Sequence, residues 1–193
     1  MKARSFRSTV TAAFRLYCSR FFPMLKALWI PLLCTSIVYT AVAWLVVYDL
    51  YLFIPLAVLA VILEVALWLM LARWLAKRPL RPLLKIAGRH WLLLLGVLLG
   101  GIIVLSPLCA FVSLPAIILI LAEWESQEAI AIGDPITIPA TIPYMVAVTC
   151  FISIFLELCI RLFIVYVAYY ACGSAETKKR EREEQIRSLS STL

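Results

Sequence analysis

Four apolar stretches, each long enough to cross a lipid bilayer, constrain this chain more than any other feature. A transmembrane helix needs about 20 predominantly apolar residues to cross a hydrocarbon core of about 30 Å. Of the 193 residues, 64% are hydrophobic, whereas a soluble domain is about half apolar. The sequence therefore predicts an all-α membrane protein with four transmembrane helices at about 27–47, 52–72, 91–122 and 144–171.

The basic residues predict how these helices are oriented. All but one of the 18 lysines and arginines lie before the first span, between the second and third spans, or after the fourth. The loops on the other side, 48–51 and 123–143, contain none. Because basic residues are retained on the cytoplasmic side during insertion, we expect both termini in the cytoplasm. The chain is then a multi-pass protein of the cell's inner (plasma) membrane.

The net charge of +7 does not predict a nucleic-acid partner. All but one of the basic residues lie at the predicted cytoplasmic ends of the spans, where they set topology and attract anionic lipids. The lipid bilayer is the expected partner, together with other membrane subunits or further copies of the chain.

The six cysteines do not predict disulfides. No CxxC pair occurs, and no cysteine falls in the outer loops, where oxidation would take place. This excludes the four-helix membrane enzymes that generate disulfides, because they need loop cysteines. We expect small apolar packing residues, four within the spans (Cys34, Cys109, Cys150 and Cys159) and two at the cytoplasmic boundary (Cys18 and Cys172).

The first 26 residues are predicted to form an amphipathic helix in the headgroup plane. Apolar and aromatic residues recur at helical spacing, and polar residues fall largely on the opposite side. Ser5 can cap the start of this helix, and Pro23 predicts an elbow into the first span. The alternative is a cytoplasmic helix packed on a partner protein. The apolar stripe is Phe6, Val10, Ala13, Phe14, Tyr17 and Phe21, opposite Arg7, Ser8, Arg15 and Ser19.

A similar elbow is predicted at about 77–90. Pro23-Met24-Leu25-Lys26 resembles Pro82-Leu83-Leu84-Lys85, 59 residues later. The chain can thus be divided into two parallel helical-hairpin repeats, although a four-residue match also arises by chance. The four-helix domain then covers 27–171, and residues 172–193 form a charged cytoplasmic tail with a solvated helix over 176–187.

The third predicted span is too long for a straight crossing. Its 32 residues would measure about 48 Å as a helix, against a core of about 30 Å. Pro107 and Pro115 lie in its outer half near Ser106 and Ser113, whose hydroxyls can satisfy a carbonyl that proline leaves free. We expect a kinked helix whose last turns project beyond the outer surface.

Two further patterns concern the third span and the outer loop. Gly96 and Gly100 form a GxxxG step, which lets another backbone approach closely; packing inside the monomer is favoured over dimerisation. In the outer loop at about 123–143, Pro135, Pro139 and Pro143 recur every four residues, and this spacing favours extended backbone.

Three ionisable residues stand within the spans: Glu64, Glu157 and Arg161. A charge at the bilayer centre costs about 2.5–3.5 kcal/mol on insertion scales, so such residues normally face a bundle interior and mark functional sites. Glu157 and Arg161 are four residues apart with the acid first, the favourable order for an ion pair. If spans two and four are neighbours, one arginine serves two carboxylates, and one negative charge remains. That carboxyl would hold its proton, bind a cation or pair with a basic group of another subunit.

Three roles for these residues stay open from sequence alone. They form a neutralised polar clamp that fixes helix register, a proton- or cation-handling site, or an interface with another membrane subunit. The preferred function is a subunit or accessory of a larger membrane assembly; the alternative is a small oligomeric transporter coupled to an intramembrane carboxylate.

No enzymatic signature accompanies the spans. The single histidine, His90, lies at the cytoplasmic boundary, and the sequence contains neither GxSxG nor HExxH nor a glycine-rich phosphate loop. We therefore expect no catalytic residues, metal site or cofactor.

The charge distribution yields a prediction about topology. A single cysteine in place of Gln127, in a variant without the native cysteines, should react with a membrane-impermeant maleimide in intact cells. A cysteine in place of Lys85 should react only after lysis, because basic segments are cytoplasmic. Labelling at position 127 only after lysis would contradict the four-span arrangement.

Overall fold

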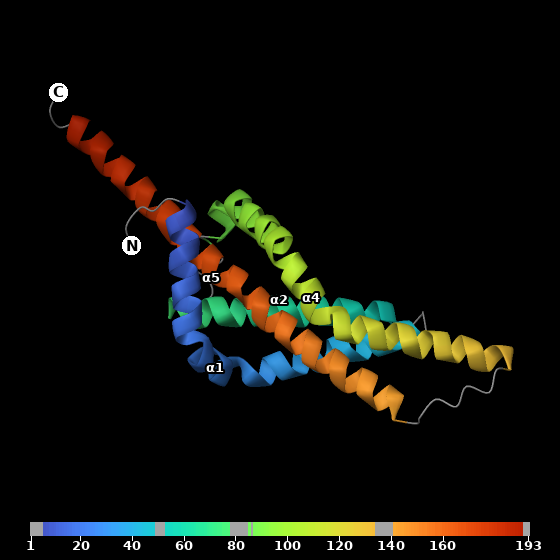
Figure 1. Ribbon diagram of the computed structural model, residues 1–193. Helices are drawn as coiled ribbons and strands as arrows, with labels where there is room; N and C mark the ends of the chain where they lie inside the picture. The colour runs from blue at the N-terminus through green and yellow to red at the C-terminus, as the bar shows by residue number, and fades with distance from the viewer. Residues whose placement is uncertain (1–5, 49–52, 78–84, 86, 134–140, 191–193) are drawn as a thin grey trace. The chain divides into compact units, whose positions relative to one another are not determined.

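The computed structural model describes residues 6–48, 53–77, 85, 87–133 and 141–190. Four long helices account for nearly all of them (Figure 1). Each contains a stretch that is long and apolar enough to cross a membrane, so the predicted multi-pass helical protein is confirmed at this level. The helices are α1 (Phe6–Tyr48), α2 (Phe53–Ala76), α4 (Trp91–Ile132) and α5 (Ile142–Ser190).

The first and last helices join segments that the sequence divides. α1 contains the predicted amphipathic segment and the first span in one helix of 43 residues that continues through Pro23. α5 likewise joins the fourth span to the charged tail in 49 residues. The tail is helical as predicted, and side chains 181–185 are exposed. The elbow at Pro23, the repeats and the placement of both termini stay predictions.

The outer loop was predicted to begin at about 123, but α4 remains helical for ten residues past 122 and ends at Ile132. Alanine, glutamate and glutamine favour a helix outside the hydrocarbon as well. The Gln127 side chain donates a hydrogen bond to Glu123, one turn earlier (3.3 Å). Gly133 then adopts a φ of 86°, the left-handed conformation with which glycine commonly ends a helix.

Some predicted features lie outside the described residues. These are Ser5, the second proline motif (Pro82-Leu83-Leu84) and two of the loop prolines, Pro135 and Pro139. α4 is helical through Pro107 and Pro115; the kink there stays a prediction.

The chain forms two compact units, and each of the four long helices contributes to both. Unit 1 comprises Met1–Ala27, Trp68–Ile103 and Leu162–Leu193; unit 2 comprises Leu28–Leu67 and Val104–Arg161. The units are defined by contacts in space, and a boundary between them falls within each of the four helices.

Aromatic packing joins α1 to α5 within unit 1. The Tyr17 ring meets Phe163 and Tyr166 edge-on, with ring centroids 5.7 and 5.3 Å apart, and Phe14 also contacts Phe163. Ala13 is fully buried, whereas Phe14 is 57% exposed. Part of the apolar stripe of α1 therefore packs on protein, and part stays exposed.

Residues near the start of α4 also make polar contacts with α5 in unit 1. Nε2 of His90 lies 3.3 Å from Oε2 of Glu176, and Nη1 of Arg89 lies 3.8 Å from Oε1 of the same carboxylate. These contacts tie the residues that precede α4 to the later part of α5.

The close helix approach in unit 1 occurs at Gly101. A Cβ at Gly101 would lie 2.9 Å from the Ile164 side chain on α5. Across the described residues, nothing lies within 4 Å of a Cβ built on Gly96 or Gly100. The packing of the GxxxG step inside the monomer therefore stays a prediction, because no described residue contacts it closely. The pattern gives the spacing of small residues but not the rotation of the helix, and the contacting face is one residue further along.

This contact predicts opposite effects for two neighbouring glycines. Gly101→Ala should lower the free energy of unfolding by about 1 kcal/mol, because overpacking costs about 1–3 kcal/mol and exceeds the gain of about 0.5–1 kcal/mol from alanine in a helix. Gly100→Ala, the matched control, should be neutral or stabilising. Thermal unfolding in detergent measures both.

The Ile164→Ala background should remove the penalty of Gly101→Ala, since it removes the atoms that the new methyl group meets. Equal effects of the two glycine substitutions would contradict the assigned contact.

Candidate functional site

The three ionisable residues of the predicted spans meet in unit 2. Nη2 of Arg161 lies 2.8 Å from Oε2 of Glu157, and Nη1 lies 3.5 Å from Oε1 of Glu64. Glu64 lies on α2, and the other two lie on α5. One arginine thus contacts two carboxylates from two helices.

Helix geometry explains the shorter of these contacts. Residues four apart lie on the same helix face, so Glu157 and Arg161 meet without any other element. Glu64 must be brought in by packing of α2, and its side chain is 12% exposed. The longer distance to Glu64 identifies it as the second partner of Arg161.

Two hydroxyl groups extend this cluster to the remaining helices. The Tyr39 hydroxyl on α1 donates to Oε2 of Glu64 at 2.5 Å. The Ser113 hydroxyl on α4 is hydrogen-bonded to Oε1 of Glu157 and lies 3.0 Å from the Cys109 carbonyl. All four long helices therefore contribute to one set of side chains, which we call the polar cluster: Tyr39, Glu64, Ser113, Glu157 and Arg161.

Tyr39 was not predicted as a site residue, and Ser113 was predicted only to bond a carbonyl freed at the proline kink. A signal for Tyr39 exists in the first span, where Thr35, Ser36, Tyr39 and Thr40 recur at helical spacing. Three of these hydroxyls donate to backbone carbonyls one turn earlier. Only Tyr39 is long enough to reach an acid 25 residues away.

The serine also does not act as expected toward proline. Pro115 removes the hydrogen bond to the carbonyl four residues earlier, that of Phe111, whereas Ser113 bonds to Cys109. Pro107 and Pro115 instead flank the turn of α4 that supplies Cys109 and Ser113. Gly96 and Gly100 belong to unit 1 and take no part in the cluster.

Charge and burial in the cluster are unbalanced. With all groups ionised, two carboxylates face one guanidinium, which leaves one negative charge. The carboxylate side chains are 12% and 15% exposed, but the Arg161 side chain is 37% exposed. Arg161 is thus the most exposed of the three charged side chains. It nevertheless lies ten residues before the end of the predicted fourth span.

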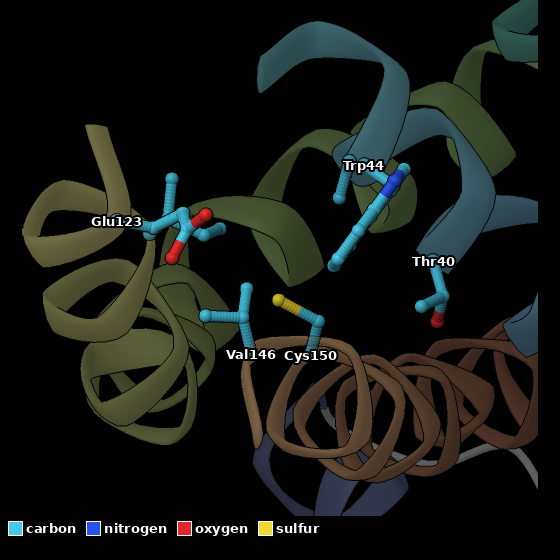
Figure 2. A pocket seen from close by; sticks show the side chains of 7 residues that line it. Thr40, Trp44, Glu123, Val146 and Cys150 are labelled. Carbon is cyan, nitrogen blue, oxygen red and sulfur yellow. The ribbon is translucent and has the colours of Figure 1, made fainter. Parts of the chain in front are cut away.

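A second feature of unit 2 is a small cavity between α1, α4 and α5. Figure 2 shows the Trp44 ring and the Cys150 sulfur beside it, with Glu123 on α4 at another side. Cys150 packs with Ala116 and Val146 in an apolar cluster, which is the packing role expected of the span cysteines. All six cysteines have free thiols. The lining of the cavity is mainly apolar.

Comparison of the chain with protein-family models, with curated proteins and with solved structures finds no match.

The polar cluster predicts unequal roles for its two acids. Glu157→Gln should lower the free energy of unfolding in detergent by about 2 kcal/mol, below the 3–5 kcal/mol typical of a broken buried pair, because Glu64 remains near the arginine. Glu64→Gln should cost less, since its contact with Arg161 is longer and glutamine can still accept the Tyr39 hydrogen bond. Thermal unfolding compares the variants.

The double variant Glu157→Gln with Arg161→Met should recover part of the loss, because it removes the stranded cation together with its partner. A larger loss for Glu64→Gln than for Glu157→Gln would mean that the interhelical pair dominates, contrary to the distances.

Proposed function

We propose that this chain is a subunit or accessory of a larger assembly in the inner membrane, and that another chain of the assembly covers the polar cluster. The single observation that carries the proposal is the Arg161 side chain, which contacts two acids yet remains 37% exposed. Both termini are cytoplasmic in this proposal, which assigns the chain no catalytic residue and no nucleic-acid partner.

Solvation of the Arg161 charge supports this assembly. Charged groups in a hydrocarbon core cost about 2.5–3.5 kcal/mol each on insertion scales, and they normally face protein or a water-filled cavity. Glu64 and Glu157 neutralise the charge of Arg161 but leave more than a third of its side chain uncovered. A neighbouring helix with a polar or acidic residue would remove this exposed surface from lipid.

The open face of α4 in unit 1 is compatible with the same role. Gly96 and Gly100 are exposed, and nothing described lies within 4 Å of their Cβ positions. Small residues at this spacing admit a second helix at short distance. This surface does not distinguish an unrelated partner from another copy of the chain.

A second candidate function is a small oligomeric transporter with proton or cation coupling. The observation that favours it is the excess carboxylate of the polar cluster, flanked by the hydroxyls of Tyr39 and Ser113. Such a group binds a proton or cation when its charge is uncompensated. In the transporter, Glu64→Gln and Glu157→Gln would abolish flux.

The assembly proposal is tested by purification from native membranes in a mild detergent. The wild-type chain should elute with at least one unrelated membrane chain in stoichiometric amount. The neutral variant Glu64→Gln, Glu157→Gln, Arg161→Met should insert into the membrane but lose this chain. As a control, the double variant Lys179→Gln, Glu183→Gln removes another i,i+4 ion pair of α5, whose side chains are 46% and 56% exposed. This control variant should still elute with the partner chain.

The other outcomes separate the candidates. Retention of the partner by the neutral variant would contradict a role for the polar cluster in the assembly. A purified homo-oligomer that carries out proton-dependent flux in liposomes would replace the assembly proposal by the transporter.

A further inference from the structure

An open groove in unit 1 lies between the beginning of α1 and the later part of α5. α1 contributes two arginines, Arg7 and Arg15, and the hydroxyls of Ser8, Thr11 and Ser19; α5 contributes Tyr170. Arg7 and Arg15 are exposed. The groove therefore combines two cations with several hydroxyl groups on one side of a helix.

The positive charge of this groove is not balanced by nearby residues in the sequence. Six lysines and arginines precede position 27, and the first 48 residues contain no aspartate or glutamate. The residue that α5 contributes is also neutral. An anion entering the groove would meet attraction without a competing carboxylate from its lining.

The donor chemistry fits a phosphate group. Guanidinium groups bind phosphate oxygens through paired N–H donors. The Thr11 hydroxyl donates to the Arg7 carbonyl (3.0 Å), and the Ser19 hydroxyl donates to the Leu16 carbonyl (3.1 Å). A hydroxyl can rotate from a carbonyl to a ligand oxygen. The two arginines are eight residues apart, about 12 Å along the helix, so their long side chains can approach one headgroup from both ends.

The surroundings of the groove fit a lipid source for this phosphate. Ala12 and Leu16 give it apolar surface, and Phe14 and Phe22 of the same helix are 57% and 79% exposed. Tyr170 stands at the end of the predicted fourth span, the level at which tyrosine meets lipid headgroups. A free phosphate would use the arginines but would leave the exposed phenylalanines without a role.

We propose that this groove binds the headgroup phosphate of an anionic phospholipid, with Arg7 and Arg15 as the phosphate ligands. The site differs from a general attraction of basic residues to the bilayer, because it is formed by two helices and holds one lipid at a defined place. It is independent of the assembly proposed for the polar cluster.

Titration of the full chain in detergent with phosphatidylglycerol, followed by native mass spectrometry, tests the site. Arg7→Gln with Arg15→Gln should weaken retention of the first lipid by about tenfold, given charge-assisted contacts from two arginines. Arg20→Gln with Lys26→Gln makes the same charge change on the same helix outside the groove, and should alter retention less than twofold. Phosphatidylcholine should bind weakly to all three proteins.

Each of the other outcomes overturns the proposal. Equal weakening by the two double variants would mean that the lipid is attracted by diffuse charge rather than by the groove. Displacement of phosphatidylglycerol by inorganic phosphate at the same concentration would make the groove a site for a soluble anion instead of a lipid.

Discussion

The contact of Arg161 with Glu157 and Glu64 is the interaction on which the arrangement of unit 2 depends. Each of these groups would be costly in hydrocarbon if it stood alone, and each lies in a predicted span that is otherwise apolar. Bringing them together at 2.8 and 3.5 Å requires a particular rotation of α2 and α5. Hydrogen bonds from Tyr39 and Ser113 impose the same requirement on α1 and α4. The polar contacts thus form only when particular faces of the four helices meet, a selection that apolar packing in lipid makes poorly.

The four helices could be predicted from the sequence because apolar length is a local property. Their ends could not, because helix propensity continues beyond the hydrocarbon: α4 reaches Ile132 through residues that favour a helix in water as well. The same reason explains why the charged tail belongs to α5. Hydrophobicity marks where a helix crosses the membrane, and capping groups such as Gly133 mark where it stops.

The composition of the candidate site was only partly predictable. Glu64, Glu157 and Arg161 stand out because ionisable residues are rare in spans. Tyr39 and Ser113 do not, since hydroxyls are common in transmembrane helices and usually bond to their own backbone. Gly101 was missed for a related reason. The GxxxG pattern selects Gly96 and Gly100, but the residue that meets Ile164 is decided by helix rotation, which requires the structure.

The exposed part of Arg161 connects this architecture to function, and its surroundings can be probed directly in the native membrane. A photo-reactive amino acid in place of Leu108, which is 48% exposed, would stand next to Cys109, whose carbonyl accepts the Ser113 hydrogen bond. If another chain covers the polar cluster, irradiation of intact cells should yield a cross-link to a second protein. That cross-link should disappear in the Glu64→Gln, Glu157→Gln, Arg161→Met background. Adducts with lipid alone in the wild-type chain would contradict the proposed assembly.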